Sequence, residues 1–168
     1  PCNYESKKNT SFAFYEDRLI KHLTVKENLT LLGFLPSDIE KWLAKFNVLD
    51  KINEYPSKLS SGQKQRVNLA RAFLSGSEVC LLDEPFSCLD TPLKLELINT
   101  LIKEQNETLK TLVCVTHDIG EALLFADKIV VIDGGKVVYS LDIKSDKQNR
   151  ENQNFASEKQ QILKVLSL

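Results

Sequence analysis

One short run of residues, 79–83, constrains the fold more than any other part of this 168-residue sequence. It reads VCLLD and is apolar at every position except the last, as expected of a parallel strand that is buried on both faces. Two further apolar runs, 111–116 and 128–133, follow it, and segments with helical periodicity lie between them. Strands that alternate with helices in this way predict an α/β domain with a mostly parallel sheet.

The chain before this strand is expected to be mainly helical. A short apolar run at 12–15 predicts a first strand. From Thr24 the sequence favours a helix that places Val25, Leu29 and Leu32 on one face.

Two more helices are expected before residue 79. Ser37 and Glu40 have the spacing of a capping box and predict the start of one of them. The other opens within 59–63 and continues to Leu74, until Gly76 ends it.

The second half of the chain continues the alternation of helices and strands. Helices are predicted over 92–105 and 118–126, the second capped by the acidic side chain at its first position. The strand at 128–133 is expected to turn at two glycines, 134–135, into a strand at 136–140, which makes a hairpin.

Residues 1–143 are therefore expected to form one domain, followed by a polar extension over 144–168. The stretch 144–154 has no apolar side chain and is predicted to be a solvated linker. It leads to a short final helix, for which Ser157 and Gln160 predict a capping box.

Composition excludes several classes of function. The 22 basic and 23 acidic residues give no electrostatic footprint for nucleic acid. No apolar stretch approaches the roughly 18 residues that span a bilayer.

The chain begins at Pro1 and contains no methionine, so we expect it to be a piece of something longer. Four cysteines lack the paired spacing of a zinc site and are interpreted as buried free thiols in a reducing cytosol: Cys2, Cys80, Cys88 and Cys114.

Residues 59–63, LSSGQ, open a helix with small hydroxyl and glycine side chains. The unpaired backbone N–H groups of a helix start, together with the helix dipole, attract an anion. Ser60 and Gln63 also have the spacing of a simple capping box, and an isolated match is more often only that.

Polar residues with catalytic potential follow two of the predicted strands. Asp83 and Glu84 come at the end of the first, at the sheet edge where α/β proteins bind ligands. One carboxylate could hold Mg²⁺ through its water shell, and the other could orient the water that attacks a phosphate. The alternative is a solvated start of a loop. His117 follows the next strand and could donate a hydrogen bond to a phosphate oxygen, although a lone histidine is usually structural.

The combination of three segments is more specific than any one of them. LSSGQKQRVNLARAF, VCLLDEPFSCLD and VTHD resemble, in this order and spacing, the signature motif, the Walker B strand with its D-loop, and the switch histidine of ATP-binding cassette (ABC) ATPases. The resemblance covers residues 12 to about 140. It implies a P-loop NTPase fold with helices on both faces of the sheet and a helical subdomain over roughly 24–75.

The resemblance also implies roles at the nucleotide. Asp83 matches the aspartate that positions Mg²⁺, Glu84 the glutamate that polarises the attacking water, and His117 the histidine that senses the γ-phosphate of ATP.

Other residues match positions that act across a dimer of two cassettes. Asp90 matches the D-loop aspartate that communicates between the subunits. The signature positions contact the γ-phosphate of ATP held by the opposite subunit and are Ser60, Ser61, Gly62 and Gln63.

The most serious departure from the family is the absence of a Walker A loop, a glycine-rich turn followed by Lys and Ser or Thr. Its strand normally lies inside the sheet, between the strand that ends at His117 and the one around 129–132. Buried backbone groups left without partners cost about 1–3 kcal/mol each, so we expect these 168 residues alone to be unstable or molten.

Two substitutions depart from the family as well. Tyr15 takes the place of the Q-loop glutamine, which contributes to the ATP site and its coupling to the membrane partner. A phenol lacks the paired donor and acceptor of an amide. Ser61 replaces a glycine of the signature, which matters only where the backbone needs a positive φ.

The resemblance implies an ATPase subunit of an importer, similar to the nitrate, sulfonate and taurine type. Its expected partners are a second cassette, transmembrane permease subunits and a solute-binding protein, and its expected place is the cytoplasmic face of the cell membrane. Two alternatives stay open: a degenerate cassette that binds or regulates without hydrolysis, and an ABC ATPase outside transport. The sequence does not identify the transported solute.

Overall fold

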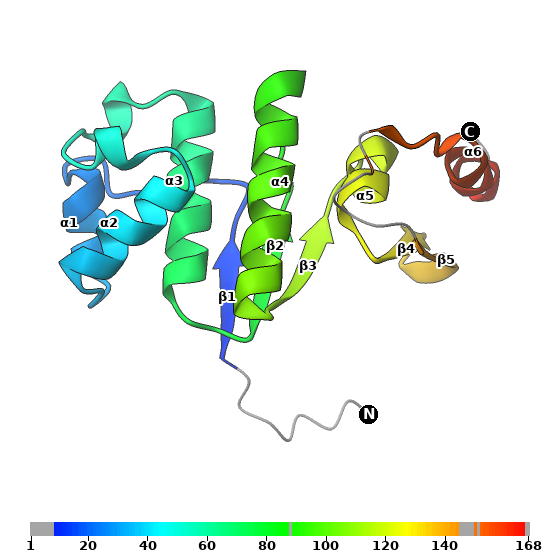
Figure 1. Ribbon diagram of the computed structural model, residues 1–168, viewed down its shortest axis with the longest axis horizontal. Helices are drawn as coiled ribbons and strands as arrows, with labels where there is room; N and C mark the ends of the chain where they lie inside the picture. Colours follow the sequence, from blue (N-terminus) through cyan, green and yellow to red (C-terminus); the bar gives the residue numbers. More distant parts are fainter. Residues whose placement is uncertain (1–8, 88, 145–149, 151, 167–168) are drawn as a thin grey trace. The chain divides into compact units, whose positions relative to one another are not determined.

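The structure is a computed structural model, and it describes residues 9–87, 89–144, 150 and 152–166. The chain divides into two compact units, Pro1–Val115 and Thr116–Leu168. The first unit contains β1 (Thr10–Ala13), α1 (Val25–Thr30), α2 (Pro36–Lys45), two 3₁₀ turns (Leu49–Lys51 and Pro56–Lys58), α3 (Ser61–Leu74), β2 (Val79–Asp83), α4 (Thr91–Thr108) and β3 (Thr111–Val115) (Figure 1). The second contains α5 (Ile119–Phe125), β4 (Lys128–Asp133), β5 (Lys136–Asp142) and α6 (Ala156–Val165).

A three-stranded parallel sheet forms the centre of the first unit, with β2 between β1 and β3. This confirms the predicted strand at 79–83 and the parallel arrangement around it. The first strand starts and ends two residues earlier than predicted, because its pairing with β2 ends at Ala13. The carbonyl of the next residue, Phe14, accepts a hydrogen bond from the Asn68 side chain of α3 and so leaves the ladder.

The prediction that β3 is a buried strand is wrong for the described chain. Val113 is 47% exposed and Val115 is 61% exposed. Among the described residues β3 pairs with β2 alone, and no strand is hydrogen-bonded to both β3 and β4. In the family the Walker A strand normally lies beside this strand, and the sequence contains no Walker A segment. The open edge of β3 agrees with the gap in the sheet that we expected for this reason.

The first helix is shorter than predicted. It begins in a capping box between Thr24 and Glu27, and it buries Val25 and Leu29 completely. The expected third member of its apolar face, Leu32, lies beyond the end of the helix and is 54% exposed.

The predicted capping box at the start of α2 is wrong. The helix begins one residue earlier, at Pro36, and its N-cap, Leu35, makes no side-chain hydrogen bond. Proline suits the first helical position because its φ is already helical and it has no N–H group to satisfy. Ser37 is therefore inside the helix, where it cannot act as the cap for Glu40.

The helix α3 has the predicted limits and is buried along most of its length. Its N-cap is Ser60, and it ends just before Ser75 and Gly76, which has a positive φ of 67°. The next helix, α4, is longer than the predicted 92–105. It starts after Asp90, whose carboxylate accepts a hydrogen bond from the Leu93 N–H at 3.0 Å.

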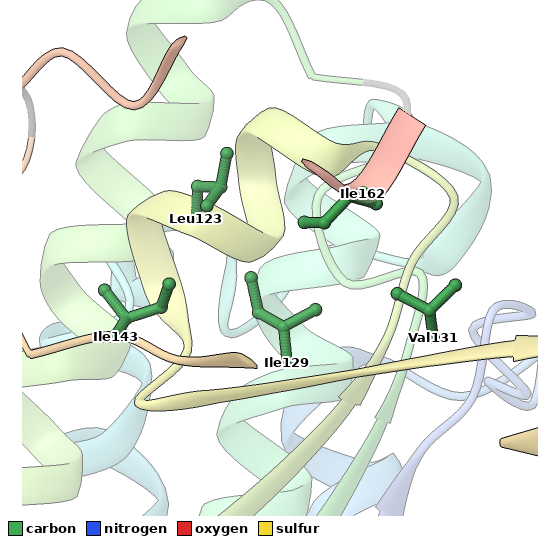
Figure 2. Close-up of a cluster of buried hydrophobic side chains, with 5 residues drawn as sticks. All are labelled: Leu123, Ile129, Val131, Ile143 and Ile162. Atoms are coloured by element: carbon green, nitrogen blue, oxygen red, sulfur yellow. The ribbon is translucent and has the colours of Figure 1, made fainter. Parts of the chain in front are cut away.

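The second unit has its own core, in which α5 and α6 pack with the β4–β5 hairpin (Figure 2). The hairpin was predicted, and both glycines of its turn have positive φ. The acidic cap predicted for α5 is Asp118, which accepts hydrogen bonds from two backbone N–H groups. The buried members of the core are Leu123, Ile129, Val131, Ile143 and Ile162.

Two predictions for the C-terminal extension are wrong. Arg150 was expected in a solvated linker but is 1% exposed, because its guanidinium donates to the carbonyls of Ala126 and Ile143 at 2.6 and 3.4 Å. The capping box at Ser157 is also absent. The N-cap of α6 is Phe155, which makes no side-chain cap bond.

Both described cysteines are thiols and not disulfides, with Cys80 buried and Cys114 partly buried. The other two, Cys2 and Cys88, lie outside the described residues. Within the described chain, every helix is too short or too polar to cross a bilayer.

Candidate functional site

The two predicted catalytic carboxylates lie where β2 ends. Asp83 is the last residue of the strand and is exposed, and Glu84 follows it and is partly buried. Glu84 has a φ of +47°, which is uncommon for any residue other than glycine and costs on the order of 1–3 kcal/mol. Its N–H donates to the Val115 carbonyl at 2.9 Å, and its own carbonyl accepts from the N–H and hydroxyl of Ser87. These bonds hold the strained residue in a fixed turn.

The carboxylates at this edge have the donor chemistry for a magnesium ion that arrives with a nucleotide. No cluster of three or more acidic, histidine or cysteine side chains surrounds them in the described part of the chain. Mg²⁺ typically uses one or two protein carboxylates and takes its remaining oxygens from water and phosphate. An exposed Asp83 fits that requirement, and the ion would supply charge neutralisation at the phosphates.

The start of α3 is a complete capping box, as the structural interpretation of LSSGQ predicted. The Ser60 hydroxyl oxygen accepts a hydrogen bond from the Gln63 N–H at 3.2 Å, and the Gln63 side-chain oxygen accepts one from the Ser60 N–H at 2.9 Å. Both bonds use acceptor atoms. The serine O–H and the glutamine amide NH₂ take no part in them, and both are donors that suit an anion.

Gly62 and Ser61 differ in what their positions require. A Cβ at Gly62 would lie 2.7 Å from a terminal methyl group of Leu89, so the first turn of α3 approaches this side chain closely, and the side chain would have to shift for a larger residue. Ser61 is the first residue of α3 and is not among the residues with positive φ. Its replacement of a family glycine therefore causes no backbone strain.

Asp90 has a structural role at the start of α4. One of its carboxylate oxygens caps the helix, and the residue is exposed. The role across a dimer that the resemblance implies for it stays a prediction.

Tyr15 lies in a bend after β1 and is 57% exposed. The loop around it is anchored to α3, because Asn68 donates to the Phe14 carbonyl and Arg71 donates to the carbonyls of Asp17 and Arg18. Burial lowers the pKa of Arg71 below its usual range. Sequence reasoning missed these anchors. Their signal was two polar residues, Asn68 and Arg71, three positions apart in the second half of the helix, which is otherwise apolar.

His117 lies in the second unit and is exposed. The residues on either side of it are held by polar bonds. The Thr116 hydroxyl donates to the Glu121 carboxylate at 2.6 Å and accepts from the Asp118 N–H at 3.1 Å. The carboxylate turn and the start of α3 both belong to the first unit, where Gln65 donates to the Pro85 carbonyl and Gly62 lies against Leu89.

Known proteins resemble this chain in sequence and in structure. A family model described as ABC transporter matches residues 2–87. An aliphatic sulfonates import ATP-binding protein of Corynebacterium glutamicum is 36% identical, over 95% of this chain and 69% of the relative. A sulfate/thiosulfate import ATP-binding protein of Synechocystis is 42% identical, over 78% of this chain and 39% of the relative. A dimeric post-hydrolysis state of the ATP-binding cassette MJ0796, bound to ADP and Pi, has a TM-score of 0.73 at 29% identity.

The chain spans only part of the length of these relatives. It covers 57% of an aliphatic sulfonates import ATP-binding protein of Paracoccus denitrificans. The match to the solved cassette covers 82% of this chain and 64% of the cassette. The likeness in structure confirms the predicted α/β cassette fold, with its parallel sheet and helices. The chain therefore belongs to the ABC transporter family and to the ATP-binding domains of that family.

Proposed function

We propose that this chain is the catalytic part of an ATP-hydrolysing subunit that drives an ABC importer. The observation that carries the proposal is the strained turn at Glu84, which follows the exposed Asp83 at the carboxyl end of a parallel strand. A non-glycine residue in a positive-φ conformation, held there by several hydrogen bonds, is typical of a functional site.

In the proposed mechanism the Glu84 carboxylate orients and polarises the water that attacks the γ-phosphate of ATP. Asp83 would hold Mg²⁺ through its water shell. His117 would donate a hydrogen bond to the γ-phosphate, and Tyr15, at the Q-loop position, would adjoin the ATP site. The donors at the start of α3, with the helix dipole, would bind the phosphate of ATP held by a second subunit.

This arrangement requires partners. Two cassettes would close on two ATP molecules, with Asp90 communicating between them. They would act on permease subunits, at the cytoplasmic face of the membrane, for a solute captured by a binding protein. Two relatives are import proteins for sulfonates and for sulfate or thiosulfate, and these names support an importer without identifying the solute.

The test replaces Glu84 with glutamine, in protein of natural length, because these 168 residues contain no Walker A loop. Loss of a general base is expected to reduce ATP hydrolysis by roughly a hundredfold to ten-thousandfold. The variant should also accumulate as an ATP-bound dimer, which light scattering can measure. Glu40→Gln, at an exposed position of α2, is the matched control. Unchanged turnover in Glu84→Gln would refute the role of Glu84.

A second candidate function is a cassette that binds or regulates without hydrolysis. Tyr15 in place of the Q-loop glutamine favours it. The intact Asp83, Glu84 and His117 oppose it. Sequencing the gene on the 5′ side of the Pro1 codon separates the two, because a G-x-x-x-x-G-K-[ST] segment there contradicts the non-hydrolysing alternative.

A further inference from the structure

A buried amide side chain connects α3 to the turn that carries the catalytic carboxylate. Gln65 lies in the second turn of α3 and is 6% exposed. Its Nε2 donates a hydrogen bond to the Pro85 carbonyl at 3.3 Å, and the bond is fully buried. A buried polar side chain that lost its partner would cost free energy, so this pairing fixes both groups.

The partner of Gln65 belongs to the residue directly after Glu84. The peptide groups of Glu84 itself are held by Val115 on one side and by Ser87 on the other. Pro85 has no N–H group, so its carbonyl is the one backbone group through which it can be held by a hydrogen bond. Gln65 supplies that bond from a different element of the fold.

The same helix touches the turn at a second point. The Gly62 backbone approaches the Leu89 side chain so closely that an added Cβ would lie at 2.7 Å from it. Gly62 and Gln65 are three positions apart and therefore lie on the same side of the helix. α3 thus contacts this part of the chain at Pro85 and again at Leu89. α3 has 14 residues and makes both contacts, and a rigid secondary-structure element of this kind can carry a shift of its first turn to the turn at Glu84.

We propose that Gln65 is a positioning residue, which fixes the Glu84 turn and makes the placement of the catalytic carboxylate depend on the position of α3. The inference rests on the proposed function, in which the start of α3 contacts the nucleotide of a partner subunit. Binding of that nucleotide would orient α3, and the Gln65–Pro85 bond would pass the orientation to Glu84. The subunit would then hydrolyse its own ATP efficiently only when α3 is engaged.

Two substitutions of similar shape test the bond in protein of natural length. Gln65→Met removes both polar atoms and fills most of the same volume, whereas Gln65→Glu keeps the shape and at neutral pH replaces the donor with an acceptor. Both should lower kcat for ATP hydrolysis by roughly tenfold to a hundredfold, the cost of a displaced catalytic group, with KM for ATP within about twofold. Gln160→Glu, at an exposed position of α6, is the matched control and should leave both parameters unchanged.

Hydrogen exchange provides a readout that does not depend on hydrolysis. The N–H groups of Glu84 and Ser87 are hydrogen-bonded within the turn, and they should exchange at least about fivefold faster in both variants. Unchanged exchange would overturn the proposal, whatever the ATPase rates. If Gln65→Met lowers both Tm and kcat and also raises KM for ATP, the variant is destabilised as a whole, and the proposal is overturned.

The two proposals fail in different ways. If the unmodified protein does not hydrolyse ATP, the proposed function is contradicted. The role of Gln65 in placing a catalytic carboxylate is then contradicted as well. If it hydrolyses ATP and Glu84→Gln abolishes turnover, but the Gln65 variants keep the normal kcat, only the positioning role is contradicted.

Discussion

At the residue scale, Ser60 and Gln63 form a helix cap that leaves hydrogen-bond donors on the same two side chains. Each side chain accepts one hydrogen bond from the other residue's backbone N–H. An accepted bond leaves the hydroxyl hydrogen and the amide NH₂ as donors, which a phosphate needs. The prediction that Ser60 and Gln63 form a capping box is therefore confirmed, and the cap is compatible with the predicted contact to a phosphate.

A substitution at Ser60 can separate these two roles. Aspartate is as good an N-cap as serine, so Ser60→Asp should change the free energy of unfolding by no more than about 0.5 kcal/mol. It also places a negative charge where we expect a phosphate, so it should abolish the ATP-dependent association of the Glu84→Gln protein. Urea unfolding and light scattering measure the two effects. Normal association would mean that the start of α3 is only a cap.

At the scale of elements, three helices of the first unit are tied together by polar bonds. The Glu96 carboxylate of α4 accepts a hydrogen bond from the Asn47 side chain at 2.6 Å and forms an ion pair with Arg66 of α3 at 3.1 Å. Further along α4, the buried Glu104 pairs with Lys45 at the end of α2. These contacts set how α3, and with it Gln65, lies against α4.

The Glu96 contacts predict a pH dependence of stability. The hydrogen bond from Asn47, and then the bond and charge of Arg66, lower the pKa of Glu96 below its ordinary value of 4.5. A lowered carboxyl pKa stabilises the fold at pH values above 4.5, and this stabilisation is lost as the pH falls further. Because the side chain is 41% exposed, we expect at most about 1 kcal/mol.

Glu96→Gln should therefore lower the free energy of unfolding at pH 7 and reduce its fall between roughly pH 5 and pH 3, a range that brackets the ordinary pKa of 4.5. Urea unfolding of protein of natural length measures both effects. Glu40→Gln serves again as the exposed control. An identical pH profile in wild type and Glu96→Gln would show that the ion pair with Arg66 contributes nothing measurable.

At the scale of the whole molecule, the open edge of β3 is the feature with the largest consequence. Its backbone groups pair on one side only among the described residues, and Val113 and Val115 expose apolar surface. In the second unit, Ile132 and Val137 of the hairpin are also largely exposed, at 65% and 66%. Exposed apolar strands with free edges are prone to pair with other chains.

We expect the 168 residues expressed alone to be unstable or molten. Their melting, followed by circular dichroism and calorimetry, should be broad and lack a cooperative heat-absorption peak, and they should bind a hydrophobic dye. A cooperative transition at high temperature would contradict this expectation. Protein of natural length provides the comparison.

The sequence by itself determined what depends on neighbouring residues and on motif order. The capping box at Ser60, the hairpin turn at Gly134 and the cap at Asp118 each involve side chains and backbone within three residues, so local chemistry decides them. The carboxylates Asp83 and Glu84 were predicted because a buried strand ends there, and the family because three motifs follow in the right order.

Only the tertiary structure decided the features that depend on contacts between distant segments. The bond from Gln65 to Pro85 crosses 20 residues, and the burial of Arg150 depends on carbonyls in two other segments. The positive φ of Glu84 exists because Val115, on a neighbouring strand, and Ser87 hold it. Exposure of β3 likewise follows from which strands pair with it. A linear pattern carries no record of such partners, because burial and hydrogen bonding arise only when the chain has folded and brought them together.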